Sequence, residues 1–89
     1  MTDEKTGSIV PDTDTGRPVI VRWIDSGLAL HGWTDAHDIP SNVVTVESIG
    51  FWIGENDDVI AIAGTQTDDE SFLNCQLIWK QAIKEKAWA

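Results

Sequence analysis

The chain has little of several residue types, and each shortage excludes a class of protein. Its 89 residues include a single cysteine, Cys75, so no intramolecular disulfide can form. A reducing, intracellular compartment is the expected environment, and Cys75, between apolar neighbours, is expected to be a small buried hydrophobe. The apolar runs fall short of the roughly 18 residues that a membrane span needs. The polar, acidic start MTDEKTGS has the wrong composition for a signal peptide. We therefore expect a soluble, cytoplasmic protein.

Basic residues are scarce as well. Six Lys and Arg stand against 15 Asp and Glu, which gives a formal net charge of −9. A protein that grips a phosphate backbone needs clustered Lys and Arg, so direct nucleic-acid binding through a broad basic face is disfavoured. The acidity favours basic partners through long-range steering. It also has a simpler role, which is to keep a small domain soluble.

Tyrosine is absent, whereas five tryptophans are present. Each buried tryptophan removes about 150–250 Å² from water, so a few of them supply much of a small core. The chain has room for one core only. We expect residues 18–89 to form a single small β domain. Residues 1–17 are polar, rich in Thr, Asp and Gly, and are expected to form a mobile arm.

The central stretch VVTVESIGFWIGENDDVIAIAG, residues 43–64, predicts a hairpin. Asn56, Asp57 and Asp58 are turn residues between two apolar runs. Val44 and Val46 have the opposite strand parity to Ile49, Phe51 and Ile53. A bulge near residues 47–48 would bring both sets into one core, and Gly50 and Gly54 mark a bend or a close backbone approach.

Further strands are expected at residues 18–24 and 72–79, with a long connection over residues 27–42. The end of the chain fits either a short amphipathic helix or a tight turn at residues 80–83 followed by a strand at 84–88, and we favour the turn. Five strands with a long first loop describe an all-β, SH3-like small barrel, which leaves few edges to aggregate. A β-sheet with a C-terminal helix is the fallback.

The segments VRWIDS, HGW and VESIGFWIGENDDVIAIAG together resemble short uncharacterised proteins encoded in phage and prophage genomes. The likeness covers residues 21–83. In those proteins an Ile-Pro-basic sequence commonly precedes the last strand, and here Ile78, Trp79 and Lys80 stand at that place without the proline. The resemblance implies a location in the cytoplasm of the bacterial host. It implies no reaction.

Catalytic motifs are weak. Residues 12–15, Asp-Thr-Asp-Thr, superficially resemble the nucleophile motif of haloacid-dehalogenase-type phosphatases, but that motif belongs to a much larger α/β domain, so a solvated acidic loop explains them better. They also lack the further ligands of a calcium loop. Glu55, Asp57 and Asp58 cluster at an exposed hairpin tip, whereas paired carboxylates do acid–base work in a cleft, so a turn explains them better.

His31 and His37 are the only histidines, with Asp35 and Asp38 beside them. Zinc sites need three or four convergent ligands, and Cys75 is distant in sequence. The simpler interpretation is that these four side chains are solvent-exposed polar residues of a loop. No phosphate-binding glycine loop is present. We predict no enzymatic activity, no cofactor and no metal.

With enzymatic and metal chemistry disfavoured, recognition of a partner through the protein surface is the remaining class of function. Trp33 and Trp52 have no clear place in a core, and exposed aromatics serve as binding anchors or stacking platforms, although both could pack under the long loop. Arg22 could hold a phosphate or a carboxylate or pair with Asp25 or Glu47. The candidate binding residues are Arg22, Trp33, Trp52, Asp35, Asp38, Asp57 and Asp58.

The main hypothesis is a non-enzymatic binding module, a phage-encoded accessory protein that binds or occludes a host or phage protein through an aromatic and acidic surface. The alternative is a homo-oligomer that sequesters a nucleotide-like signal, with Arg22 and Trp33 or Trp52 lining the pocket. A virion or assembly component is a further alternative. None of the three requires contact with nucleic acid or a membrane.

Overall fold

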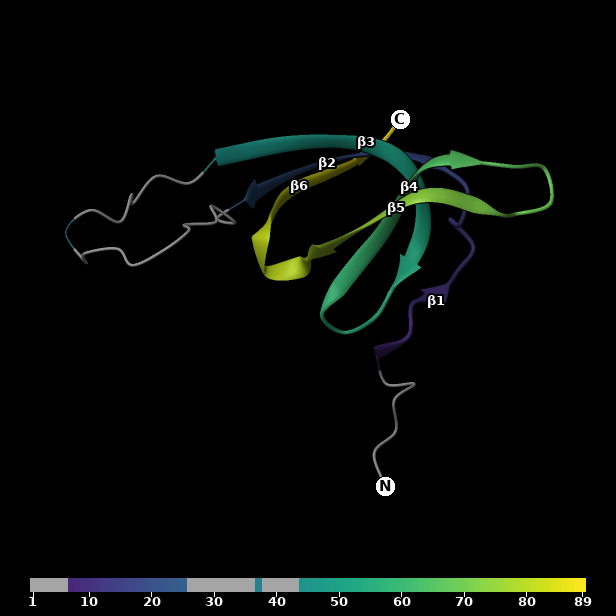
Figure 1. Ribbon diagram of the computed structural model, residues 1–89, viewed down its shortest axis with the longest axis horizontal. Helices are drawn as coiled ribbons and strands as arrows, with labels where there is room; N and C mark the ends of the chain where they lie inside the picture. Colours follow the sequence, from purple (N-terminus) through teal and green to yellow (C-terminus); the bar gives the residue numbers. More distant parts are fainter. Residues whose placement is uncertain (1–6, 26–36, 38–43) are drawn as a thin grey trace, which may run out of the picture.

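The computed structural model describes residues 7–25, 37 and 44–89 of the chain. Regular structure in these ranges consists of six strands and one short 3-10 helix, and no α-helix occurs in them (Figure 1). The elements are β1 (Val10–Pro11), β2 (Pro18–Asp25), β3 (Val44–Glu55), β4 (Val59–Gln66), β5 (Phe72–Trp79), η3 (Lys80–Ala82) and β6 (Ile83–Trp88). Within the same ranges, no helix is long and apolar enough to cross a membrane.

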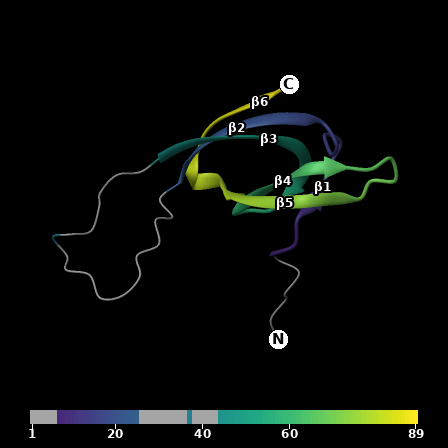
Figure 2. The ribbon, with the colours of Figure 1, turned by 45° about the horizontal axis from the view of Figure 1, so that its top comes forward.

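The strands form one antiparallel sheet in the order β5-β4-β3-β2-β6, and β1 pairs with β3 beside this path. Figure 2 shows β2, β3 and β6 in one layer and β4 and β5 in a second, with β3 bending from the first layer into the second. The prediction of an all-β domain is confirmed. The described sheet has six strands and is not closed, because its end strands β5 and β6 are not paired with each other, so it differs from the expected five-stranded barrel.

One face of the bent sheet, here called the inner face, carries the core. Alternating residues of β2 and β4 point into it, and they are mostly β-branched, as expected of strands. The half-buried Trp23, Ile83 and Trp88 pack against this cluster. The buried cluster is Val19, Val21, Trp52, Ile60, Ile62 and Ile78.

Trp52 is the largest fully buried side chain of the described residues, with 1% of its surface exposed. Its ring meets that of Trp88 edge to face, with centroids 5.5 Å apart. Trp52, which the sequence left without a clear place in the core and proposed as a candidate binding residue, is therefore a core residue. Its position on β3 has the same parity as Gly50, which faces Val19 across the strand pair, and this parity directs the indole inward.

The bulge predicted near Glu47 and Ser48 is absent, because both residues pair regularly with β2. The irregularity of β3 lies instead between Trp52 and Gly54, on the side facing β4. No bulge is needed at the earlier place, because Ile49 does not join the core and stays 69% exposed on the outer face.

The glycines of β3 do mark close backbone approaches. A Cβ atom on Gly50 would lie 2.6 Å from the carbonyl oxygen of Ala63, and one on Gly54 would collide with the carbonyl oxygen of Val10. Gly54 therefore permits β1 to lie against β3, where Val10 pairs with Glu55 and Pro11 with Gly54. β1 belongs to the stretch that the sequence assigned to a mobile arm, and its described part, residues 7–17, contacts the sheet.

The end of the chain is a tight turn and a strand. η3 reverses the chain after β5, and β6 then pairs with β2 from Ile83 to Trp88. The Lys80 amide donates a hydrogen bond of 2.8 Å to the Asp58 carbonyl, which fixes this corner to the turn between β3 and β4. The preferred interpretation of the C-terminus is confirmed, and the fallback with a C-terminal helix is wrong.

Candidate functional site

The outer face of β5 exposes a row of apolar side chains. Leu73, Cys75, Leu77 and Trp79 alternate along the strand and form what we call the apolar stripe. Leu73 and Leu77 are each 62% exposed and Trp79 is 61% exposed. Cys75 is exposed as well, so the expectation of a buried thiol is wrong. The stripe offers a partner a continuous apolar surface.

The neighbouring strand β4 places small side chains beside the apolar stripe. Across the strand pair, Leu77 faces Ala61 and Cys75 faces Ala63. Both alanines are almost fully buried, and their methyl groups are the smallest apolar side chains that a strand can present. The larger leucine and tryptophan side chains of β5 therefore lie beside much smaller neighbours on β4.

An apolar cleft adjoins the Trp79 end of the stripe. A cavity of about 510 Å³ is lined by Ile24, Trp79, Gln81 and Ala82. A second cavity of about 290 Å³ shares three of these residues and also touches Trp23, Asp25, Leu77 and Ile78. At this cleft the end of β2 contacts η3, whereas β5 and β2 are not paired. Its volume lies within the range of about 300–1,000 Å³ that is usual for ligand pockets.

Carboxylates flank the stripe at both ends. Asp57 and Asp58 lie in the turn between β3 and β4, which the Asp58 carbonyl ties to Lys80 just beyond Trp79. Asp68, Asp69 and Glu70 lie in the turn between β4 and β5, just before the other end. The stripe itself carries no charge. The surface is therefore apolar along its length and acidic at its two ends.

Both acidic turns are held by their own side chains. The Asn56 side-chain oxygen accepts bonds of 2.8 Å from the amides of Asp58 and Val59. In the other turn, the Ser71 amide donates to the Thr67 hydroxyl at 3.1 Å. A hydrogen bond from the Thr67 hydroxyl is the main cause that lowers the pKa of Asp69, with a smaller contribution from the Ser71 side chain. The negative charges are thus presented in ordered turns.

The one basic side chain at the corner next to Trp79 is already engaged. Lys80 Nζ lies 2.7 Å from a carboxylate oxygen of Glu55. This pair neutralises one positive and one negative charge, so the turn carboxylates of Asp57 and Asp58 set the sign of the field at that end. A cationic group on a partner would find them without competition from Lys80.

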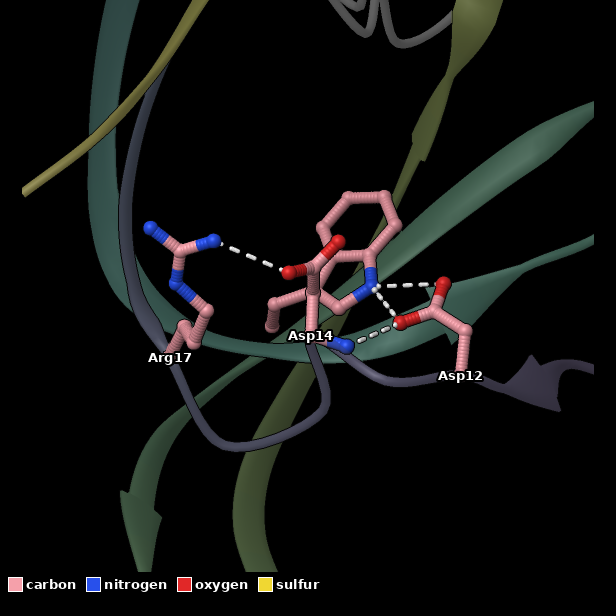
Figure 3. Close-up of polar contacts among 4 residues, drawn as sticks. Asp12, Asp14 and Arg17 are labelled. Atoms are coloured by element: carbon pink, nitrogen blue, oxygen red, sulfur yellow. Dashed lines mark hydrogen bonds and ion pairs between the residues drawn. The ribbon is translucent and has the colours of Figure 1, made fainter.

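Residues 12–17 form a second polar cluster, which we call the clasp (Figure 3). The buried Trp52 indole N–H donates to both carboxylate oxygens of Asp12 at 3.1 Å. Asp12 also accepts a bond of 2.8 Å from the Asp14 amide, and Arg17 donates to Asp14 at 2.9 Å. The Asp-Thr-Asp-Thr sequence is therefore a structural turn that covers the core, and its first carboxylate has a specific buried partner.

Backbone bonds fix the clasp to β3. The Gly16 amide donates to the Trp52 carbonyl at 2.7 Å, and the Trp52 amide donates to the Arg17 carbonyl at 2.8 Å. The Thr15 hydroxyl donates to the Ile53 carbonyl at 2.6 Å. These bonds anchor residues 15–17 at the bend of β3.

Two cations cover the tryptophans beside the clasp. The Arg17 guanidinium lies 4.5 Å from the ring centroid of Trp88. Lys86 Nζ lies 4.5 Å from the Trp52 ring and 4.7 Å from the Trp88 ring. Cations within about 6 Å of an aromatic face are attracted by the ring quadrupole. These two basic groups therefore cover the tryptophan rings and stabilise the fold.

The structure separates the residues that the sequence proposed for binding. Arg22 lies on the outer face of β2, with guanidinium nitrogens 3.5 Å from Glu85 and 4.0 Å from Glu47. Trp52 lies on the inner face. Arg22 and Trp52 therefore do not line a common pocket, whereas pairing of Arg22 with Glu47, the other alternative, is observed.

Of the other candidate binding residues, Asp57 and Asp58 lie beside the apolar stripe. Trp33, Asp35, Asp38 and His31 lie outside the described residues.

Sequence reasoning missed Trp79 and Leu77 as surface residues. It expected Cys75, which alternates with them on the same side of β5, to be a small buried hydrophobe. The opposite side contains Asn74 and Gln76, which look like solvent-facing residues, although it contributes Ile78 to the core. Sequence periodicity shows which residues share a side of the strand, but not which side the rest of the sheet covers.

The described residues hold no group of three or more His, Cys, Asp or Glu side chains placed to bind a metal ion. What they bring together is an apolar surface with carboxylates at its ends. No protein-family model, curated protein or solved structure matches the chain.

Proposed function

We propose that this chain is a non-enzymatic protein-binding module that holds its partner on the apolar stripe and the adjoining cleft. In this proposal it is a phage-encoded accessory protein that binds or occludes a host component in the bacterial cytoplasm. The observation that carries the proposal is the exposure of Leu73, Leu77 and Trp79, each above 60%, along a single strand. Large contiguous apolar surface on a small domain is typical of an interaction site.

Burial of Trp79 would contribute as much energy as a typical binding hot spot. With 61% of its surface exposed, Trp79 would lose on the order of 100 Å² of accessible surface when covered. At roughly 25 cal/mol per Å², this burial contributes about 2–4 kcal/mol. Contributions of that size are typical of binding hot spots, where tryptophan is enriched. Trp79 is the proposed anchor.

The carboxylates at the two ends of the stripe define the expected partner. A protein with a net charge of −9 attracts a basic surface from a distance, and charge complementarity raises the association rate more than the affinity. A host protein that presents apolar residues within a basic surface, such as a nucleic-acid-binding face, would fit this site. Binding would occlude that face.

We also propose that the sheet is an opened relative of an SH3-like barrel. The chain from β2 to β6 has five strands with η3 before the last one, which is the expected order, and β1 is an addition to it. In this interpretation the cleft is the gap at which the barrel fails to close.

The test is affinity capture from bacterial lysate with quantitative mass spectrometry. The variant L77S/W79S removes the stripe next to the cleft. V44S is the matched control, because Val44 is equally exposed but lies on β3. We expect wild type and V44S to retain the same protein and L77S/W79S to lose it. The proposal would be refuted if wild type, V44S and L77S/W79S retained the captured protein equally, or if wild type retained no specific protein.

The cleft supports a second candidate function, the binding of a small molecule. Its volume suits a ligand, and Trp79 offers an aromatic face for stacking. Among the described residues that line it, none is Lys or Arg, so an apolar or aromatic group fits better than a phosphate. Native mass spectrometry of the gently purified protein tests this function: a species carrying a few hundred additional daltons supports it, and a mass equal to that of the bare chain or its oligomer contradicts it.

A further inference from the structure

The two end strands of the sheet differ in how they are protected. β6 contains Lys84, Glu85 and Lys86, whereas β5, Phe-Leu-Asn-Cys-Gln-Leu-Ile-Trp, contains no charged residue and no proline. Charged side chains and proline on an edge strand prevent pairing with other chains. No described residue pairs with β5 on the side away from β4. β5 therefore has the features of a strand that accepts another strand.

The half of β5 that adjoins the cleft has the regular geometry that pairing requires. Residues 75–79 pair with residues 63–59 of β4 without a shift in register. Irregular backbone is confined to the other half, where Asn74 has a φ of 60°. The regular segment also holds Leu77 and Trp79. An added strand would thus align along residues 75–79.

The acidic turns at the two ends of β5 indicate which kind of strand could pair with it. A second copy of this chain would bring its own acidic turns to the ends of β5. In an antiparallel pair, the turn at residues 67–71 would meet Asp57 and Asp58 of the other copy, and in a parallel pair each turn would meet its equivalent. Both arrangements place like charges together, which is unfavourable. A strand with basic residues near both ends matches this edge.

We propose that β5 is a site of strand addition. Its occupant is an extended segment of a partner protein, with apolar side chains at alternating positions and Lys or Arg near each end. This proposal rests on the proposed function and specifies how the partner binds. Main-chain hydrogen bonds to β5 would supply affinity, and side chains would supply specificity.

The side chains of the added strand have defined neighbours. Cross-strand pairs place Cβ atoms about 4.5–5.5 Å apart, so alternate residues of the partner would contact the exposed Cys75, Leu77 and Trp79 side chains. At the Trp79 end, one apolar side chain of the partner would enter the cleft beside Ile24 and Ala82. Its basic residues would face the two acidic turns.

Panning of a display library of random peptides of about nine residues against the full chain tests this chemistry. We expect enriched sequences with Lys or Arg near both ends and with β-branched or aromatic residues at alternating positions between them. Enrichment of acidic sequences, or of apolar residues at the three- and four-residue spacing of a helix, would overturn the proposal. So would the absence of any enrichment.

The most enriched peptide then locates the added strand by hydrogen exchange. We expect amide exchange in residues 75–79 to slow at least about tenfold on peptide binding, and exchange in β6 to be unchanged. In C75K/L77K, two exposed residues of the edge become cationic, and we expect the peptide to bind at least about tenfold more weakly. V44K is the control, with a new charge at an exposed position of β3. Equal binding to C75K/L77K and V44K contradicts strand addition.

Failure of this proposal can be distinguished from failure of the proposed function. If a lysate protein depends on Trp79 for capture, but its binding leaves exchange in residues 75–79 unchanged, protein binding stands and strand addition is wrong. If exchange in residues 75–79 slows with rising protein concentration and no peptide, the occupant is a second copy of this chain, and the proposal of a basic partner strand is wrong.

Discussion

Asp12 is the residue whose loss should reveal how the clasp stabilises the core. Its carboxylate accepts the indole N–H of Trp52, a side chain with only 1% of its surface exposed. In D12A this donor has no acceptor, and leaving a buried donor unsatisfied costs about 1–3 kcal/mol. The second bond of Asp12, from the Asp14 amide, is exposed and adds little. We expect the free energy of unfolding to fall by about 1.5–3 kcal/mol.

The assay is chemical denaturation followed by tryptophan fluorescence and by circular dichroism, with thermal unfolding as a second measurement. For a domain of this size, each kcal/mol lowers the Tm by about 4–8 °C. D14A is the matched control, because it removes only the half-exposed ion pair with Arg17, and such pairs are worth about 0–1 kcal/mol. D12N, which keeps one acceptor oxygen, should lose less than D12A. If D12A and D14A unfold with the same free energy, the indole bond does not stabilise the fold.

Three further substitutions test other contacts. G54A should lower the free energy of unfolding by about 1–3 kcal/mol in denaturant titrations, because the added methyl group would collide with the Val10 carbonyl and displace β1. K86A should cost about 0.5–1 kcal/mol and change the intrinsic fluorescence, because it uncovers two indole rings. T67V should raise the pKa of Asp69 towards its ordinary value of 3.8 in an NMR titration, because the lowering hydroxyl is removed.

A control variant or the direction of the measured change can contradict each of these three predictions. G64A places its methyl group 3.4 Å from the Asn74 Cβ, an ordinary contact, so it should be tolerated better than G54A. K84A should leave the fluorescence unchanged. The lowered pKa of Asp69 means that its contribution to stability is present above the unfolded-state pKa and is lost as the pH falls through the folded-state pKa. A pKa of Asp69 that stays low in T67V would exclude the hydroxyl as its cause.

The sequence predicts the local structure of this domain well where the signal is short-range. The central hairpin appears as β3 and β4 around the turn at Asn56, and the C-terminal turn and strand appear as η3 and β6. Both depend on turn residues and alternation within a few positions. The position of the bulge was wrong, because the interpretation required Ile49 to be buried although it can remain on the outer face.

The candidate site was only partly predictable, for physical reasons. Asp57 and Asp58 were identified as exposed acidic residues, and the structure places them beside the apolar stripe. The exposure of Trp79 depends on which face of β5 the bent sheet covers, and this is a tertiary property. The bond between Asp12 and Trp52 joins residues 40 positions apart, and no periodicity encodes such a contact. Burial of Trp52 follows from the same long-range arrangement.

The contrast between the two edge strands also bears on the solubility of the protein. β5 has no charge of its own to keep two copies apart, so the repulsion between copies comes from the acidic turns at its ends and from the net charge of −9 on each molecule. That repulsion disappears as the carboxylates take up protons towards the isoelectric point near pH 4.3, and salt screens it. Mild acid would therefore make the uncharged strand β5 the surface on which the protein begins to precipitate.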